Sequence, residues 1–271
     1  MSRRRELGET SARSLLMTVL GEFVLPRDRP VWTATLVGTL ALFDVEEKSA
    51  RQALARTAGE GWLTAERHGR RVRWALTPPG RRLLTEGGER VHGFGRADRS
   101  WDGRWLVLIV SVPEAKRELR HRLRTRLSWA GFGSPSAGVW VSPDTSREHE
   151  AQVILEDLGL AAGAMSFAAH YGTIGSQESI TQQAWDLEAI AARYEEFIDE
   201  FTGLHPAPGD ASLVAQTRLV HEWRRFPFLD PQLPQELLPA RWSGTTAAAL
   251  FRRKHAEWNP AAQRRWEELT A

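Results

Sequence analysis

Residues 32–76 carry the pattern that most limits how this chain can fold: two short helices followed by a two-stranded hairpin rich in arginine. The second helix is expected to begin after the acidic residues Glu46 and Glu47. Its small and apolar residues recur every three or four positions, which places them within an arc of about 100° on one side of the helix. These residues are Ala50, Ala53, Leu54 and Thr57. The sequence therefore predicts a helix with one buried side and one exposed, basic side.

The hairpin follows directly after this helix, which Gly59 and Gly61 are expected to end. Two strands are predicted, Trp62–Arg67 and Arg71–Leu76, joined by a turn at His68–Arg70. The second strand alternates apolar residues with a set that includes two arginines, so one face is expected to pack and the other to present guanidinium groups. The apolar residues are Val72, Trp74 and Leu76.

A helix that can enter a groove, beside a hairpin that can hold phosphates, is typical of a winged helix-turn-helix that reads duplex DNA. An arginine-rich hairpin by itself is more often a solvated edge, but the order of the elements favours DNA binding. The predicted DNA contacts are Lys48, Arg51, Gln52, Arg56, Arg67, Arg70, Arg71 and Arg73. Among these, Arg51, Gln52 and Arg56 are expected to reach base edges, whereas Arg67, Arg71 and Arg73 mainly hold phosphates.

Charge is distributed unevenly along the chain. The first 100 residues hold about 18 Lys and Arg against about 12 Asp and Glu, whereas the rest hold about 18 against about 22. The chain has no cysteine, no signal peptide pattern and no apolar run long enough to span a membrane, so a cytoplasmic protein without disulfides or thiol-ligated metal is expected. The basic residues 2–6 could be a DNA-contacting arm or a loose terminus.

The length predicts two or three domains, and the element pattern predicts an α+β fold. Residues 1–95 form the winged-helix domain, with a first helix capped by Ser11 and a nearly apolar, buried helix at 33–42. Residues 100–175 follow the order strand, helix, strand, strand, helix, strand, which is ferredoxin-like, with short strands near 132 and at 138–141 separated by 134–137. Residues 180–271 are expected to form a helical domain around an irregular, proline-rich segment at 226–234.

Several motifs, taken together and in order, resemble the PaaX family of transcriptional regulators. They are the segments Phe23–Pro26, Arg51–Arg56, Glu60–Leu63, Trp101–Trp105, Gly138–Trp140 and His221–Pro231. The resemblance implies a cytoplasmic homodimeric repressor with a winged-helix domain, a middle domain similar to the Cas2 fold that is expected to dimerise, and a helical C-terminal domain. It also implies a DNA operator of an aromatic acid (phenylacetate-type) catabolic operon and release by an aryl-CoA thioester such as phenylacetyl-CoA.

Enzymatic activity is the alternative: a Cas2-like nuclease or a CoA-thioester hydrolase fused to a DNA-binding module. A metal-dependent nuclease of that fold needs a carboxylate at the end of the first strand, where this chain has Ser111. The histidines show no HxxxH or HExxH spacing, and no nucleophile elbow or phosphate-binding glycine loop is present. We therefore expect no catalytic residue, no bound metal and no cofactor other than the effector.

A CoA thioester needs cations for its phosphates and an apolar pocket for its acyl group. The first candidate combines arginines with aromatic residues near the C-terminus: Trp223, Arg224, Arg225, Phe226, Phe228, Arg241 and Trp242. The second is the predicted helix face of Arg117, Arg120 and Arg124 with Trp129. For both sets, core aromatics and solvated arginines remain the alternative interpretation.

Overall fold

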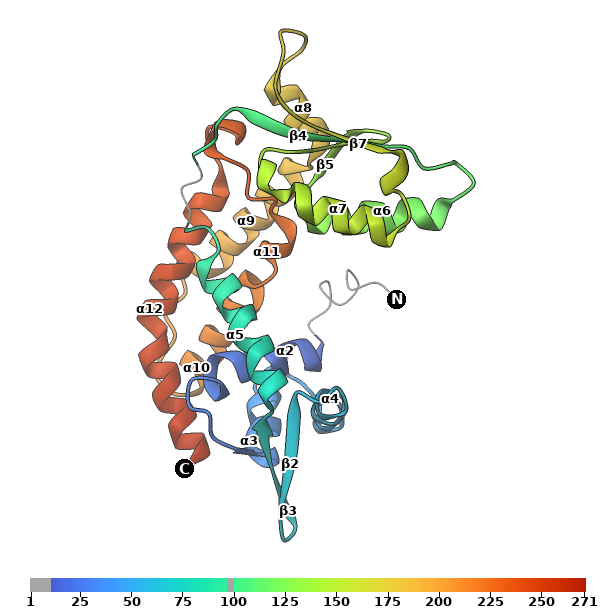
Figure 1. The fold of residues 1–271 in the computed structure, drawn as a ribbon. Helices are drawn as coiled ribbons and strands as arrows, with labels where there is room; N and C mark the ends of the chain where they lie inside the picture. Colours follow the sequence, from blue (N-terminus) through green and yellow to red (C-terminus); the bar gives the residue numbers. More distant parts are fainter. Residues whose placement is uncertain (1–10, 97–99) are drawn as a thin grey trace. The chain divides into compact units, whose positions relative to one another are not determined.

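The computed structural model describes residues 11–96 and 100–271, and these form two compact units (Figure 1). The predicted basic arm at residues 2–6 lies outside the described residues. One unit comprises the described part of 1–94 together with 196–226 and 246–271, and the other comprises 95–195 and 227–245. The helices after residue 184 therefore contribute to both units.

The first unit begins with α2 (Ala12–Val19), which continues as a π-helical turn, η1 (Leu20–Val24). The Ser11 hydroxyl accepts a hydrogen bond from the backbone N–H of Ser14, which confirms the predicted N-cap. Two more helices follow, α3 (Thr33–Ala41) and α4 (Glu47–Gly59). The helix predicted at 33–42 is not buried on all sides, because α3 buries Leu36, Thr39 and Leu40 but exposes Ala34 and Gly38.

The wing consists of β2 (Leu63–His68) and β3 (Arg71–Leu76), and Figure 1 shows it as a long hairpin beside α4. A short strand, β1 (Val31–Trp32), pairs with β3 and makes a three-stranded sheet of order β1-β3-β2. The next helix, α5 (Pro78–Gly93), is capped by the Thr77 hydroxyl, which accepts a hydrogen bond from the backbone N–H of Gly80.

Three further helical segments complete this unit: the second part of α9 (Leu187–Thr202), α10 (Asp210–Trp223) and most of α12 (Ser243–Thr270). The core of α2, α3 and α4 includes Leu213 from α10 and Trp266 from α12. Phe23 stacks on Trp266 with ring centroids 5.3 Å apart. The helices near the C-terminus therefore pack directly on the winged-helix elements within one core.

The second unit contains an antiparallel sheet of order β5-β6-β4-β7, formed by β4 (Arg104–Val110), β5 (Gly133–Ser136), β6 (Val139–Ser142) and β7 (Ala164–His170). The helices α6 (Arg117–Trp129) and α7 (Glu148–Asp157) lie on the same side of this sheet in Figure 1. Their apolar residues share a core with Leu106, Leu108 and Val110 of β4. The element order and strand order confirm the ferredoxin-like prediction.

Several boundaries in this unit differ from the predictions. Ser134, Pro135 and Ser136 belong to β5 rather than to a connection, and proline is tolerated there because β5 is an edge strand. Two helices, α8 (Gln177–Ala184) and α9, lie within residues 177–202, and the segment predicted to be irregular begins with a short helix, α11 (Phe226–Leu229). Single turns occur at η2 (Thr145–Arg147), η3 (Ala161–Gly163) and η4 (Gln235–Leu237).

Among the described residues, every helix is too short or too polar to cross a lipid bilayer.

Candidate DNA-binding surface

One side of α4 is buried in the core of the first unit. Ala50, Ala53, Leu54 and Thr57 are all buried, and the Thr57 hydroxyl donates to the carbonyl of Ala53. These are the four residues that the spacing predicted. Burial of this side fixes the rotation of α4 about its axis and thereby determines which side chains face solvent.

The opposite side of α4 is exposed and bears the predicted reading residues. Lys48, Arg51, Gln52 and Arg56 are all exposed. Arg51 donates from Nε to Glu47 Oε1 at 2.7 Å in an exposed pair one helical turn apart. An exposed pair of this kind contributes only about 0.3–0.5 kcal/mol, so Arg51 can leave Glu47 for a better acceptor at little cost.

The wing places its arginines on two different faces. Arg67 lies opposite Val72, whereas Arg71 lies opposite His68. Because directly paired residues share a face and neighbours alternate, Arg67 and Arg71 point to opposite sides of the hairpin. Both are exposed, as is Arg70 in the turn beside Gly69, whose φ of +61° favours glycine. The exposed tip can therefore present cations to phosphates on either side.

Arg73 differs from the other wing arginines. Its guanidinium carbon lies 4.1 Å from the centroid of the Trp32 ring, and its Nε is buried without a hydrogen-bond partner among the described residues. Arg73 is therefore only half exposed, whereas the alternation predicted a guanidinium presented to solvent. The physical reason is β1, which the sequence analysis did not predict: Trp32 pairs with Arg73 in the sheet and brings an indole face under the guanidinium.

Trp32 is accordingly a site residue that sequence reasoning missed. The Arg71 guanidinium lies 5.9 Å from its ring centroid, and the His68 ring meets it edge to face at 5.8 Å. The Trp32 ring thus contacts His68, Arg71 and Arg73 on one face of the wing. The available signal was a Val-Trp pair before the predicted helix at 33–42, which is a β-forming dipeptide too short to be recognised alone.

Part of the predicted effector set lies in the core of the first unit. Trp223 is buried, stacks on Phe251 at 4.7 Å and donates from Nε1 to the carbonyl of Val91. Phe226 is buried beside it, with ring centroids 5.2 Å apart. These contacts agree with the alternative interpretation of core aromatics.

Arg224 and Arg225 also form internal contacts. Arg224 donates from Nη1 to the Ser14 carbonyl at 2.8 Å and to the Thr18 hydroxyl at 2.9 Å, which ties the end of α10 to α2. Arg225 donates to Glu222 at 2.9 Å. Arg224 thus links the end of α10 to α2, the helix that packs against α4.

The other residues of the same predicted set belong to the second unit. Phe228 is half exposed, Arg241 is exposed, and Trp242 meets Tyr194 edge to face at 5.7 Å. The Tyr194 hydroxyl donates to Asp230 at 2.6 Å. The structure therefore divides the set between the two units.

The second predicted effector face is on α6. Arg117, Arg120 and Arg124 are exposed at intervals of three and four residues, so they share one side of the helix. Arg120 also donates to the carbonyl of Glu114 at 2.7 Å. Trp129, at the end of the same helix, is half exposed. The cations of this face are exposed, whereas Arg224 is half-buried.

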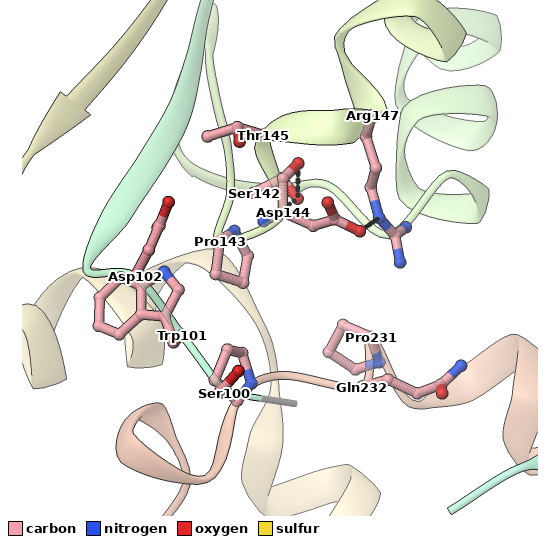
Figure 2. Close-up of a pocket in the computed structure, with 11 residues that line it drawn as sticks. Ser100, Trp101, Asp102, Ser142, Pro143, Asp144, Thr145, Arg147, Pro231 and Gln232 are labelled. Atoms are coloured by element: carbon pink, nitrogen blue, oxygen red, sulfur yellow. Dashed lines mark hydrogen bonds and ion pairs between the residues drawn. The ribbon is translucent and has the colours of Figure 1, made fainter. Parts of the chain in front are cut away.

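A pocket of about 420 Å³ lies in the second unit (Figure 2). It is lined by residues 100–102, 142–145, 147, 231, 232 and 234. Hydrogen bonds from Arg104 lower the pKa of Asp102. Burial raises the pKa of Asp144, but hydrogen bonds from Ser146 and Arg147 outweigh that effect and lower it. Both carboxylates are therefore ionised at neutral pH and paired with arginines, Asp102 with Arg104 and Asp144 with Arg147.

The end of β4 lacks the carboxylate that a metal-dependent nuclease of this fold requires. The strand ends at Val110, and the exposed Ser111 follows it. Asp102 lies before β4 and pairs with Arg104 at 2.7 Å, and Glu114 lies beyond the strand in the connection to α6. The arrangement around β4 therefore offers no support for the enzymatic alternative within the described residues.

Comparisons with known proteins agree with this architecture. Three family models match the chain: a PaaX-like protein model at residues 11–80, the central Cas2-like domain of PaaX proteins at 98–181, and the C-terminal domain of PaaX-like proteins at 185–268. The Transcriptional repressor PaaX of Escherichia coli (strain K12) is 31% identical over 264 residues, which cover 93% of this chain and 82% of that protein. A solved structure, the uncharacterized protein Rv0674 from Mycobacterium tuberculosis, superposes with a TM-score of 0.64 at 23% identity, covering 97% of this chain and 100% of that one.

Proposed function

The chain belongs to the PaaX family, and from this premise we propose that it is a transcriptional repressor that reads an operator through α4 and the β2–β3 wing. The observation that carries the proposal is the exposed side of α4. Its buried side is anchored by four small or apolar residues, so Arg51 and Gln52 are held at the surface with donors suited to guanine and adenine edges. The exposed wing arginines beside it supply phosphate contacts.

We further propose that the repressor acts as a homodimer on an inverted repeat. A single winged helix contacts only a few base pairs, so two readers related by symmetry are needed for useful selectivity. The edge strand β7 supports this proposal, because Met165 and Phe167 are half exposed and Ile109 of β4 is 38% exposed beside them. An apolar edge strand left open to water favours pairing with another copy of itself.

The proposed effector is an aryl-CoA thioester such as phenylacetyl-CoA, and the target is an aromatic acid catabolic operon. The α6 arginines are the accessible cations for its phosphates, whereas Arg224 is placed to pass a change in α10 to α2. The ligand releases DNA only if it binds more tightly to the dimer conformation that cannot bind the operator than to the conformation that can.

Footprinting on promoters next to the gene, repeated with each thioester, tests the whole proposal. We expect protection of an inverted repeat that phenylacetyl-CoA abolishes, and a Tm increase with the effective thioester. Arg117→Ala combined with Arg120→Ala should raise the thioester concentration needed for release. Arg224→Ala should leave thioester binding intact but uncouple it from release. Protection that every thioester leaves unchanged would contradict the effector proposal.

A further inference from the structure

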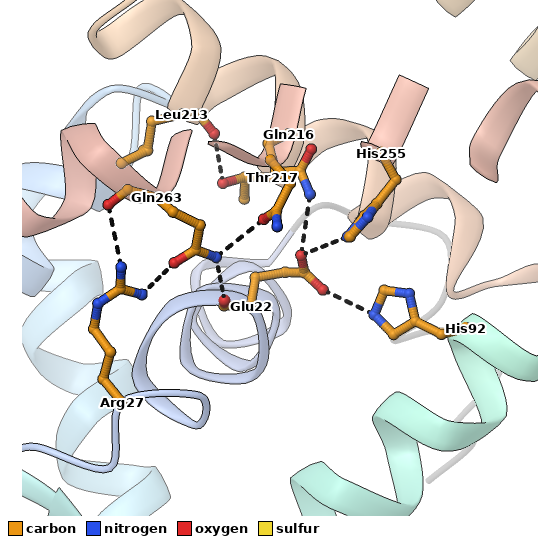
Figure 3. Close-up of polar contacts among 9 residues, drawn as sticks. Glu22, Arg27, His92, Leu213, Gln216, Thr217, His255 and Gln263 are labelled. Carbon is orange, nitrogen blue, oxygen red and sulfur yellow. Dashed lines mark hydrogen bonds and ion pairs between the residues drawn. The ribbon is translucent and has the colours of Figure 1, made fainter. Parts of the chain in front are cut away.

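Three side chains from distant parts of the sequence meet at one point in the first unit (Figure 3). Glu22 comes from η1, His92 from α5 and His255 from α12. Nε2 of His92 lies 3.1 Å from Oε1 of Glu22, and Nε2 of His255 lies 3.1 Å from Oε2 of the same carboxylate. One ligand atom from each of the three residues lies within 4.8 Å of the others.

We propose that Glu22, His92 and His255 form a binding site for a divalent transition-metal ion, with Zn²⁺ as the first candidate. Two imidazole nitrogens and a carboxylate oxygen are ligands that Zn²⁺ prefers, whereas Ca²⁺ and Mg²⁺ prefer oxygen alone. Ligand atoms bound at about 2.0–2.1 Å in a tetrahedron lie roughly 3.3 Å apart. Each imidazole lies 3.1 Å from a different oxygen of the Glu22 carboxylate, and the ligand atoms all lie within 4.8 Å of one another, so they would move closer together around an ion.

Gln216 supplies an independent indication of a ligand. Its side chain is completely buried, its Nε2 lies 3.2 Å from Oε2 of Glu22, and its Oε1 has no hydrogen-bond partner among the described residues. The oxygen and nitrogen of an amide exchange places on a half-turn about its last torsion angle. With a cation present, that half-turn directs the oxygen toward the ion as a fourth donor.

The site is accessible to an ion and rigidly supported. The His92 and His255 side chains are 36% and 23% exposed, which leaves a path from solvent, whereas the Glu22 side chain is only 8% exposed. The two imidazole rings meet edge to face at 4.9 Å, and Phe251 packs against both at 5.9 and 5.7 Å. Packing of this kind fixes the ring orientations and reduces the ordering needed on binding.

An ion at this position would join three elements of the unit that carries α4. It would link η1, which continues the first helix, to α5, which follows the wing, and to the C-terminal helix α12. Binding therefore stabilises the folded unit, and it requires both imidazoles to offer Nε2 as a lone pair, with any ring proton on Nδ1.

Titration of untagged full-length protein with Zn²⁺, in competition with a chromophoric chelator, tests the proposal. We expect one equivalent to bind, and Tm to rise by about 5–10 °C at a Zn²⁺ concentration one hundred times Kd. His92→Gln and His255→Gln should each weaken binding by tenfold or more. Co²⁺ should bind at the same stoichiometry and give the visible absorption of a four-coordinate site in the parent but not in the His92→Gln or His255→Gln variant.

The matched control is His205→Gln, because His205 is an exposed histidine that lies 3.8 Å from an acidic residue of α12, Glu257. This variant should bind Zn²⁺ like the parent. His92 and His255 are partly exposed, so their glutamine variants are expected to fold, and circular dichroism checks this. If the parent binds well under one equivalent of Zn²⁺ at micromolar concentrations, or if the His92→Gln/His255→Gln double variant binds like the parent, the proposal is overturned.

Discussion

His221 is a buried histidine that folding keeps neutral. Its burial lowers its pKa from 6.5 to about 4, and the positive charges of Arg224 and Arg225 act in the same direction. The Thr18 hydroxyl, which accepts from Arg224, lies 3.0 Å from Nδ1 of His221 and can donate to it. The neutral ring is therefore part of the contact between α10 and α2.

A pH dependence of stability follows from this pKa. The unfolded chain binds a proton at this histidine below pH 6.5, whereas the folded chain does so only near pH 4. The stabilisation is therefore fully present above pH 6.5 and is lost as pH falls toward 4, by about 3 kcal/mol over the whole window. Urea unfolding of the parent and His221→Gln at a series of pH values measures it. Parallel curves for the two proteins across this window would contradict the assignment.

Arg71 and Arg73 flank Val72 on the same strand but should respond differently to substitution. Arg71→Ala should weaken binding to cognate and random DNA alike and reduce the salt slope by about one unit, with little change in stability. Arg73→Ala removes the stacking on Trp32 and should lower stability by roughly 0.5–2 kcal/mol. Salt-dependent binding and urea unfolding of both variants separate the two effects, and equal losses of stability would refute the distinction.

At the scale of elements, the beginning of α5 is packed more closely than its middle. A Cβ on Gly80 would lie 2.1 Å from the backbone carbonyl oxygen of Trp62, whereas a Cβ on Gly87 would meet nothing within 4 Å. Backbone atoms cannot move aside as a flexible side chain can. The lack of a Cβ at Gly80 therefore allows α5 to begin in direct contact with the backbone at the start of the wing.

The two glycines thus form a matched pair of tests on one helix. Gly80→Ala should destabilise the protein by roughly 1–3 kcal/mol, because relief of the overlap must shift α5 or the wing. Gly87→Ala should stabilise it by about 0.5–1 kcal/mol through helix propensity alone. Thermal and urea unfolding measure both, and a Gly80→Ala variant as stable as the parent would show that the wing can move away freely.

Elements with a long repeating pattern could be predicted from sequence, and short ones could not. The burial of α4 and the ferredoxin-like order follow from periodicity that extends over many residues. The strand β1 has two residues and exists because β3 pairs with it. The strand β5 contains Pro135, pairs only with β6 among the described strands and packs against the end of α8, where a Cβ on Gly133 would meet Ala184 and Trp185. Such elements depend on tertiary neighbours that a local window does not contain.

The same limit applies to the sites. The exposed side of α4 could be predicted because it is the complement of a buried stripe within one helix. The Glu22, His92 and His255 cluster could not, because its members are 70 and 233 residues from Glu22 along the chain. Arg224 has the charge expected of a ligand contact, but its guanidinium donates to the Ser14 carbonyl of α2. Only the fold reveals this contact.

At the scale of the whole molecule, the proposed dimer makes a separate prediction. Phe167→Lys should place a charge in the proposed β7 contact and yield monomers with much weaker operator binding, since each reader alone contacts few base pairs. Val153→Lys on α7 is the matched control, because Val153 is also exposed but lies outside β7. Analytical ultracentrifugation measures the change. A parent that sediments as a monomer while binding the operator with full affinity would contradict the dimer.

The central claim is that α4 reads the operator, and affinity for cognate and random duplexes measured at one salt concentration tests it most directly. We predict that Arg51→Ala and Gln52→Ala each cost roughly 1–3 kcal/mol on the footprinted operator and much less on random DNA. Arg264→Ala, an exposed arginine of α12, should leave both affinities unchanged. If the two α4 variants instead bind the operator like the parent, or lose equal affinity for both duplexes, then α4 does not read the sequence and the account is contradicted.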